Sequence, residues 1–300
     1  MGAGEYFAFG FGPGELPDDQ RDDDALSACF DGGPTPAPLD LLGAPLVKLT
    51  IAADQPRAQI AVRLCDVAPN GASALITHGF LNLRHRHGFE VPIDMPVNQA
   101  EEISVTLDQC AYRLPAGHRL RLSISSSYWP FIWPEQKPTT LTITAGAVDL
   151  PIRPLAAANE WQFAEPEAAA PLPVRQHSPI NEAKRVEFDA ATGVRNITIE
   201  SDTGEVEDQT TGLIMAIKMR EVWSIQIDDP TSARSDFEWV RTMRRALPEG
   251  ARGNDWTVKT VARLSQRCEQ NDFVVESSIT AYEGDVLVIR NEFADRIPRP

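Results

Sequence analysis

Three hundred residues are enough for two domains of ordinary size, and 42% hydrophobic with 24% charged side chains describe a folded chain rather than a disordered one. The 28 Lys and Arg are outnumbered by 43 Asp and Glu, which gives a net charge of −15. Such a surface repels nucleic-acid backbones and anionic membranes, so neither is expected as a partner. The amino terminus lacks the basic start and apolar run of a secretory signal. No apolar run approaches the roughly 18 residues of a membrane helix, and we therefore expect a cytoplasmic protein.

Residues 1–38 differ from the rest and are interpreted as an extended N-terminal segment. Glycine and aromatic residues alternate from Tyr6 to Gly12, an acidic run follows from Asp18 to Asp24, and a proline-rich connector ends the segment. Such a segment forms no core alone, so its aromatic side chains must pack on the domain or on another polypeptide, or form an exposed patch. The acidic run could bind Ca²⁺ but lacks the spacing of a calcium loop. We favour a solvated or capping role, in which Asp22 or Asp23 caps a helical turn at Asp24 to Ala28.

Residues 39–153 show the alternation of half-buried strands and no long amphipathic helix. The sequence predicts about seven short strands, a number typical of a sandwich or jelly roll. The expected strands are Leu46–Ile51, Gln59–Leu64, Leu75–Leu83, Glu102–Leu107, Arg119–Ile124, Thr139–Ile143 and Ala147–Ile152. Turns are predicted at Pro69-Asn70-Gly71, where glycine permits a positive φ, and at Pro115-Ala116-Gly117-His118.

Residues 154–180 are rich in Pro and Ala and are predicted to be a linker, with Trp161 and Phe163 resting on a surface. Residues 181–300 return to strand patterns and predict a second, antiparallel β-meander domain. Its expected strands are Asn196–Glu200, Leu213–Ile227, Ser235–Met243, Asp255–Leu264, Phe273–Tyr282 and Val286–Phe293. The fold class is therefore all-β throughout.

Several ordered segments resemble the carboxy-terminal jelly-roll domain of the Xaa-Pro dipeptidyl-peptidase and cocaine-esterase family of serine hydrolases, a galactose-binding-like β-sandwich. These segments are Leu16 to Asp24, Phe30-Asp31, Leu39 to Pro45, Val62 to Val67, Thr77 to Leu83 and Pro115 to Ser127. Residues 181–300 look like the extra β region of some longer bacterial members. The resemblance implies a partner, because in that family the chemistry belongs to an α/β-hydrolase domain, where a serine on a sharp turn is activated by His and Asp.

That catalytic turn requires the pattern G-x-S-x-G, which does not occur in these 300 residues. None of the family's triad residues can be carried over, so we predict no catalytic residue and an inactive isolated chain. The resemblance then implies a non-catalytic portion that packs on, or shapes the site of, a separate α/β-hydrolase domain or subunit. The sequence leaves homo-oligomers open.

The aromatic run Tyr128-Trp129-Pro130-Phe131-Ile132-Trp133-Pro134 is the main contact candidate. Its two prolines exclude a regular central strand, so we expect Tyr128, Trp129, Phe131 and Trp133 on an irregular loop that displays large rings. Core capping or packing on a neighbouring domain is favoured over the wall of a substrate pocket. The alternative function is a stand-alone β-sandwich module that stacks this loop on a carbohydrate or peptide.

Other reactive side chains predict structural roles. His85 and His87 would share one face of a strand and could bind a metal, but no third ligand follows at a fitting spacing, so solvated imidazoles are favoured. Cys29, Cys65, Cys110 and Cys268 form no CxxC pair and are interpreted as buried thiols. Asp66 is expected to accept hydrogen bonds from its turn, and His118 to bond locally. We expect neither a metal nor a cofactor.

Overall fold

The computed structural model describes residues 19–154, 163–246, 255–269 and 271–299. It divides into two compact units, Met1–Trp161 and Gln162–Pro300, and each is described by itself. Both units are built almost entirely from antiparallel strands, so the predicted all-β class is confirmed. No helix among the described residues is long and apolar enough to cross a membrane.

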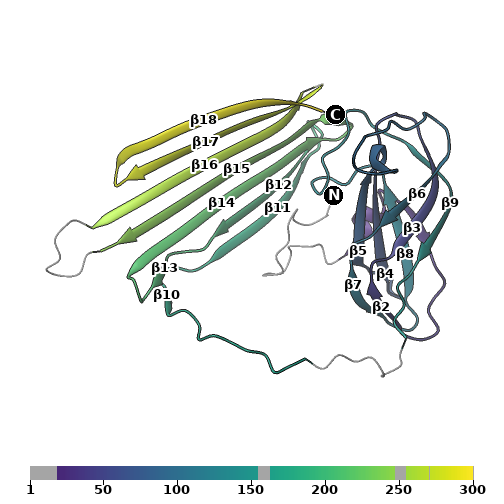
Figure 1. Ribbon diagram of the computed structural model, residues 1–300, viewed down its shortest axis with the longest axis horizontal. Coiled ribbons are helices and arrows are strands. Elements are labelled where there is room, and N and C mark those ends of the chain that lie inside the picture. Colours follow the sequence, from purple (N-terminus) through teal and green to yellow (C-terminus); the bar gives the residue numbers. More distant parts are fainter. Residues whose placement is uncertain (1–18, 155–162, 247–254, 270, 300) are drawn as a thin grey trace. The chain divides into compact units, whose positions relative to one another are not determined.

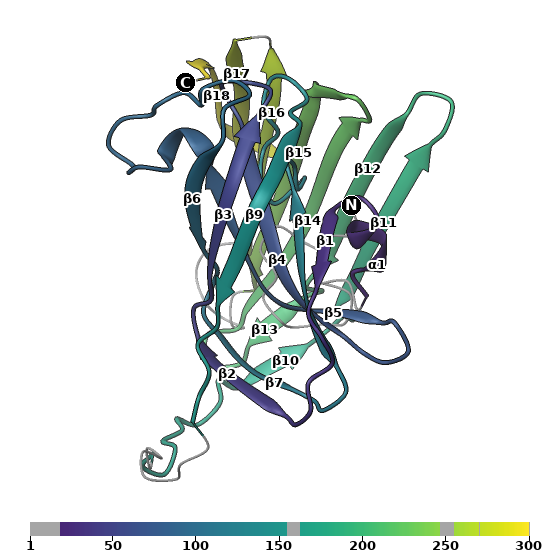
Figure 2. The ribbon, with the colours of Figure 1, turned by 90° about the vertical axis from the view of Figure 1, so that its right-hand side faces the viewer.

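The first unit is a sandwich of short strands (Figures 1 and 2). Its elements are α1 (Arg21–Asp24), β1 (Ala28–Asp31), β2 (Leu39–Gly43), β3 (Leu46–Ala53), β4 (Gln59–Val67), β5 (Ser73–Asn82), η1 (Leu83–His85), β6 (Glu101–Thr106), β7 (Cys110–Leu114), β8 (Arg119–Ser125) and β9 (Leu141–Asp149). One sheet has the order β1-β8-β4-β5, a second has the order β6-β3-β9, and β2 pairs with β7. Strands β1, β2 and β7 were not predicted.

The core lies between the two larger sheets, where alternate side chains of each strand meet. In β3 the residues Val47, Leu49 and Ile51 are buried while the residues between them are not. They share one hydrophobic cluster with Ile60 of β4 and Ile103 of β6. Alternation with period two therefore produces the sandwich, because each sheet can offer one apolar face to the other.

Strand β4 is the exception, because all of its residues are buried. Its even-numbered side chains from Ile60 to Leu64 enter the core, while Ala61, Arg63 and Cys65 lie on the opposite face of the strand. That outer face must also be covered. The cover includes the helix α1 and the aromatic run, and this is where the candidate site lies.

The second unit is one broad antiparallel sheet (Figure 1). Its strands are β10 (Val174–Gln176), β11 (Asn181–Asp189), β12 (Val194–Asp202), β13 (Val206–Asp208), β14 (Leu213–Gln226), β15 (Asp229–Arg245), β16 (Trp256–Glu269), β17 (Asp272–Glu283) and β18 (Val286–Pro298). From β14 onward each strand pairs with the next, as a meander requires. Turns of this sheet have a positive φ at Gly193 and Gly284, which glycine adopts without strain.

The two faces of this sheet have different chemistry. The register places Met219, Trp239 and Ala262 in one row across β14, β15 and β16, and it places Glu221, Phe237 and Leu264 in a neighbouring row on the same face. The opposite face carries ion pairs between neighbouring strands, such as Arg263 with Glu238 at 2.6 Å and Arg220 with Glu200 at 3.4 Å. The sheet is therefore amphipathic, although many apolar side chains remain partly exposed.

Four expectations are corrected. The strands expected at Thr139–Ile143 and Ala147–Ile152 are one strand, β9. Gly146 pairs with Leu49 of β3 and leaves room for its side chain, and the register shift between Ala145 and Ile143 does not end the strand. The helical turn α1 ends at Asp24, where it was expected to begin, and its N-cap position is Gln20. Strands β10, β11 and β13 were not predicted, and β10 falls within the expected linker. Phe163 is 85% exposed and rests on no surface, while Trp161 lies outside the described residues.

Candidate functional site

The aromatic loop, defined as residues 128–134, follows β8 and is folded onto the first unit. Tyr128 is 8% exposed and Trp129 is 1% exposed, so the expectation that the loop displays these rings is wrong. Phe131 and Trp133 are half-buried. The rings of Trp129 and Trp133 meet edge to face with centroids 4.9 Å apart. Burial of large apolar rings is favourable, so packing of the rings stabilises this loop in place of strand pairing.

Tyr128 and Phe131 pack on the outer face of β4 and β5. The ring of Phe80 lies 5.9 Å from that of Tyr128 and 6.0 Å from that of Phe131, and His78 lies 5.4 Å from Phe131 edge to face. Tyr128 and Ala61 form a small buried cluster of their own. Burial in this cluster raises the pKa of the Tyr128 hydroxyl and lowers that of the His78 imidazole, because both charged forms lose water there.

A buried charge pair lies beside the cluster. Arg63 is 1% exposed, its guanidinium lies 5.4 Å from the Tyr128 ring centroid, and its Nη2 atom lies 3.0 Å from Oδ1 of Asp24. The hydroxyls of Ser73 and Ser123 donate to Asp24 at 2.7 and 2.6 Å. A buried ion pair is favourable only when the remaining donors and acceptors of both partners also form hydrogen bonds. Here the two serine hydroxyls donate to the remaining lone pairs of the Asp24 carboxylate.

The same network holds the N-terminal segment on the sandwich. Arg63 donates to Oε1 of Gln20 at 2.7 Å and to the hydroxyl of Ser27 at 3.2 Å. Arg121 of β8 pairs with both Asp24 and Asp31, and this pairing keeps the pKa of Asp31 below its usual range. The acidic run therefore has a buried structural role at Asp24, and the solvated or capping role expected for it is wrong there.

A groove of ≈ 440 Å³ opens beside the aromatic loop. It is lined by hydroxyl groups and apolar side chains, with the carboxylate of Asp23 at one side. The lining residues are Asp23, Leu26, Ser27, Ala28, Ile124, Ser125, Ser126, Ser127, Tyr128, Trp129, Thr139, Thr140, Leu141 and Ile143. This lining contains no His, Cys or Lys, so it offers neither an imidazole base nor a thiol or amine nucleophile for acyl transfer. It suits the docking of a mixed polar and apolar surface.

One His–Asp pair has the geometry that catalytic triads use. The Nδ1 atom of His118 lies 2.7 Å from Oδ1 of Asp66, and the hydroxyl of Tyr112 donates to Oδ2 of Asp66 at 2.8 Å. Burial, together with the hydrogen bond to the Asp66 carboxylate, raises the pKa of Tyr112 to about 12, so the phenol stays protonated. We expected Asp66 to accept hydrogen bonds from its own turn and His118 to bond locally, and both expectations are wrong.

The third member of a triad is not at this pair. Within the described part of the chain, no serine, threonine or cysteine side chain is hydrogen-bonded to the imidazole of His118. A nucleophile must lie within hydrogen-bond reach of its base to be activated. The pair therefore joins the turn before β8 to β4, and Tyr112 joins β7 to the same carboxylate, as a structural cross-link.

The remaining candidates are scattered. His85 ends the short helix η1 and stacks on Phe89 at 5.7 Å, while His87 is exposed. In the described ranges no group of three or more His, Cys, Asp or Glu is placed to hold a metal ion. All four cysteines are free thiols. Cys65 and Cys268 are buried as expected, and burial raises the pKa of Cys65 to about 12, whereas Cys29 is exposed.

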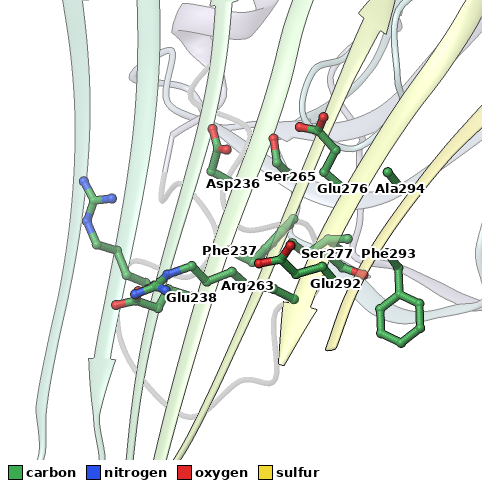
Figure 3. A pocket seen from close by; sticks show the side chains of 13 residues that line it. Asp236, Phe237, Glu238, Arg263, Ser265, Glu276, Ser277, Glu292, Phe293 and Ala294 are labelled. Atoms are coloured by element: carbon green, nitrogen blue, oxygen red, sulfur yellow. Dashed lines mark hydrogen bonds and ion pairs between the residues drawn. The ribbon is translucent and has the colours of Figure 1, made fainter. Parts of the chain in front are cut away.

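The second unit carries a hollow of ≈ 560 Å³ on its sheet (Figure 3). Its lining holds four acidic and two basic side chains. Figure 3 shows Glu238 beside Arg263, and Asp236 near Ser265 and Glu276. Arg263 and Glu238 pair with each other, and the other charged groups of the lining pair with residues outside it. Because each charged group of the lining already has a partner of opposite sign, the hollow is poorly suited to select a charged ligand.

Sequence reasoning missed Asp24 and Arg63. A signal was present, because Arg63 is a single charged residue inside the apolar run from Ile60 to Cys65. A cation within a fully buried strand needs an anion close to it, and the acidic run was the available source. The partner could not be chosen from sequence, because Asp22, Asp23 and Asp24 are adjacent and only the fold decides which of them reaches Arg63.

The comparison with protein families decides the origin of the first unit. Residues 5–170 match the family model described as the X-Pro dipeptidyl-peptidase C-terminal non-catalytic domain. The chain belongs to this family. The match ends before the sheet of the second unit, so residues 171–300 lie outside it. No match was found among the curated proteins.

Solved hydrolase structures resemble part of this family member. An α-amino acid ester hydrolase shares 23% identity over 45% of this chain and 27% of its own, with a TM-score of 0.43. An aminopeptidase from a marine sediment Thaumarchaeota archaeon shares 20% identity over 46% and 28%, also with a TM-score of 0.43. A CocE/NonD family hydrolase from Staphylococcus aureus shares 13% identity over 45% and 32%, with a TM-score of 0.37. The chain thus spans less than a third of the length of each of these proteins.

Proposed function

We propose that this chain is the non-catalytic carboxy-terminal portion of a serine hydrolase of the Xaa-Pro dipeptidyl-peptidase and cocaine-esterase type. In this role it packs on an α/β-hydrolase catalytic domain and helps to shape its site, while that domain performs the acyl ester or X-Pro peptide hydrolysis. The family match over residues 5–170 carries the proposal. Free thiols at all four cysteines suit a cytoplasmic location, which belongs to the same proposal.

The chemistry of the first unit favours a non-catalytic role. His118 pairs with Asp66, and the Tyr112 hydroxyl donates to the same carboxylate. Within the described residues, no hydroxyl group is hydrogen-bonded to the imidazole of His118. The groove beside the aromatic loop offers serine and threonine hydroxyls with apolar walls. Phe131 and Trp133 of the aromatic loop are half-buried. We assign these two side chains and the groove to the surface that contacts the catalytic domain.

The first test asks whether the chain alone has activity. The purified chain is incubated with p-nitrophenyl esters and with Xaa-Pro-anilides, and we expect no turnover above the uncatalysed rate. A fluorophosphonate probe should label no serine. Turnover that this probe abolishes would contradict the proposal.

The second test addresses the contact surface. The chain is mixed with a candidate α/β-hydrolase domain, and binding is measured by calorimetry. We expect the paired substitutions Phe131→Ala and Trp133→Ala to weaken binding by at least tenfold, because truncated aromatic anchors at a contact typically cost more than about 1.4 kcal/mol. The control His87→Ala changes an exposed side chain and should bind as the parent does. Equal affinity of the paired variant would place the contact elsewhere.

The alternative, a module that stacks the loop on a carbohydrate or peptide, is not favoured by the geometry. Stacking on a sugar or peptide requires an accessible ring face. Trp129 is 1% exposed and its ring meets that of Trp133 edge to face. The ring of Trp129 is therefore buried in the protein's own interior, where a ligand cannot stack on it.

A further inference from the structure

Strand β18 forms one edge of the sheet in the second unit (Figure 1). It pairs with β17 on one side, and every one of its 13 residues is exposed. An edge strand offers a row of unpaired backbone N–H and C=O groups to any further strand. A long edge of this kind is therefore a surface for strand addition.

The two edges of the sheet are not equivalent. Among the strands at the opposite end of the sheet, β11 carries a charged side chain at five of its nine positions, which discourages pairing. The first part of β18 is instead four consecutive apolar residues, Val286 to Ile289, with exposures between 48% and 68%. The protection that charged residues give to β11 is therefore missing from this part of β18.

The middle of β18 is self-complementary. Around Asn291 the sequence reads Ile289-Arg290-Asn291-Glu292-Phe293, so an apolar and a basic residue on one side mirror an acidic and an apolar residue on the other. When two identical strands pair antiparallel about a two-fold axis, the axis passes through a pair of identical residues. With the axis at Asn291, Arg290 faces Glu292 of the other copy, and Ile289 faces Phe293, each twice.

We propose that β18 is a dimerisation edge, and that it pairs antiparallel with β18 of a second copy of this chain about an axis at Asn291. The pairing extends the two faces of the sheet without interruption. Arg290 and Glu292 lie on the face that carries the ion pairs, where they already contact one another within the strand. Ile289 and Phe293, 48% and 57% exposed, lie on the apolar face.

Neighbouring registers lack this complementarity. An axis at residue 290 places Arg290 opposite its own copy, and an axis at residue 292 does the same with Glu292. An axis at residue 293 places Arg290 opposite Arg296. Like charges directly opposite destabilise a strand pair, so a centre at Asn291 is favoured over these three. A bulge leaves Val288 without a partner on β17, which marks one end of the regular pairing.

The charges provide the first test. The full chain is studied by analytical ultracentrifugation up to concentrations in the hundreds of micromolar, and we expect a monomer–dimer equilibrium. Glu292→Arg places like charges opposite one another twice and should raise the dimer Kd about tenfold or more, by loss of two attractive pairs. The double variant Arg290→Glu with Glu292→Arg restores opposite charges and should recover the dimer. Glu238→Arg, in the interior of the same face, is the matched control and should leave the Kd unchanged.

A cross-link provides the second test. Directly opposite residues of an antiparallel pair have Cα atoms about 4.5 or 5.5 Å apart, within the range of a disulfide. In a Cys29→Ser background, Asn291→Cys should form a symmetric disulfide dimer on mild oxidation, whereas Glu187→Cys on β11 should not. Efficient dimerisation by both, a monomer at all concentrations, or a β11–β18 ladder of growing oligomers would each overturn the proposal. None of these outcomes depends on the catalytic partner of the preceding section.

Discussion

The two units solve the same problem, an amphipathic strand, in different ways. In the sandwich the apolar side of β3 faces that of β4 across one core, and the charges that are buried include the hydrogen-bonded pair of Asp24 and Arg63. In the second unit the strands are longer and the ion pairs lie on an open face, such as Arg263 with Glu238. Similar alternation therefore gives a closed, buried core in one region and a broad two-faced surface in the other.

The difference indicates which kind of interaction stabilises each unit. A buried pair is costly to break because the remaining charge stays in a low-dielectric site, whereas exposed pairs are screened by water and salt. A side chain in the closed core leaves a cavity when it is truncated, whereas a half-exposed one leaves only surface. Three predictions test this comparison.

The largest effect is expected for the buried pair. Asp24→Ala leaves Arg63 buried without its anion and two serine hydroxyls without their acceptor, which should cost about 3–5 kcal/mol of unfolding free energy. Urea denaturation followed by circular dichroism measures the loss. Glu238→Ala removes one partner of an exposed pair and should leave the transition midpoint unchanged. Equal losses for the two variants would show that the units do not differ as described.

The next effect is expected for the apolar side chains. Ile51 is 0% exposed in the sandwich core, so Ile51→Ala should destabilise the first unit by about 2–5 kcal/mol through lost burial and a cavity. Ile279, on the apolar face of the second unit, is 39% exposed. Ile279→Ala should cost much less in the same denaturation experiment. A large loss at Ile279 would mean that this face is packed as tightly as a core.

Sequence patterns gave the strands with clear alternation and missed those without it. Strand β3 was predicted because Val47, Leu49 and Ile51 alternate with polar residues, and burial of that face is a local property. Strand β11 was missed because an exposed edge strand has no apolar face to reveal it. Its position follows only from pairing with β12, which no local pattern encodes.

The candidate site was predictable in its residue types but not in its burial. Prolines in the run from Tyr128 to Pro134 correctly indicated a loop, yet the direction of each ring depends on the outer face of β4 and β5 beneath it. The link between Asp66 and His118 joins residues far apart in the sequence, so a turn-centred interpretation could not find it. Long-range pairing is the information that the sequence alone withheld.

The smallest predicted effect concerns pH and the cover on the outer face of β4. Burial and the nearby Arg63 guanidinium lower the pKa of His78 in the folded state, although Asp108 partly opposes them. The unfolded chain then takes up the proton first as the pH falls, so the stability that neutral His78 contributes is complete above its unfolded pKa of about 6.5 and is lost below it. Denaturation midpoints measured between pH 8 and pH 5 should therefore fall less for His78→Gln than for the parent chain. Parallel slopes for the two chains would mean that His78 is not excluded from water by Phe131 and Phe80, and that the aromatic loop does not close over this face in solution.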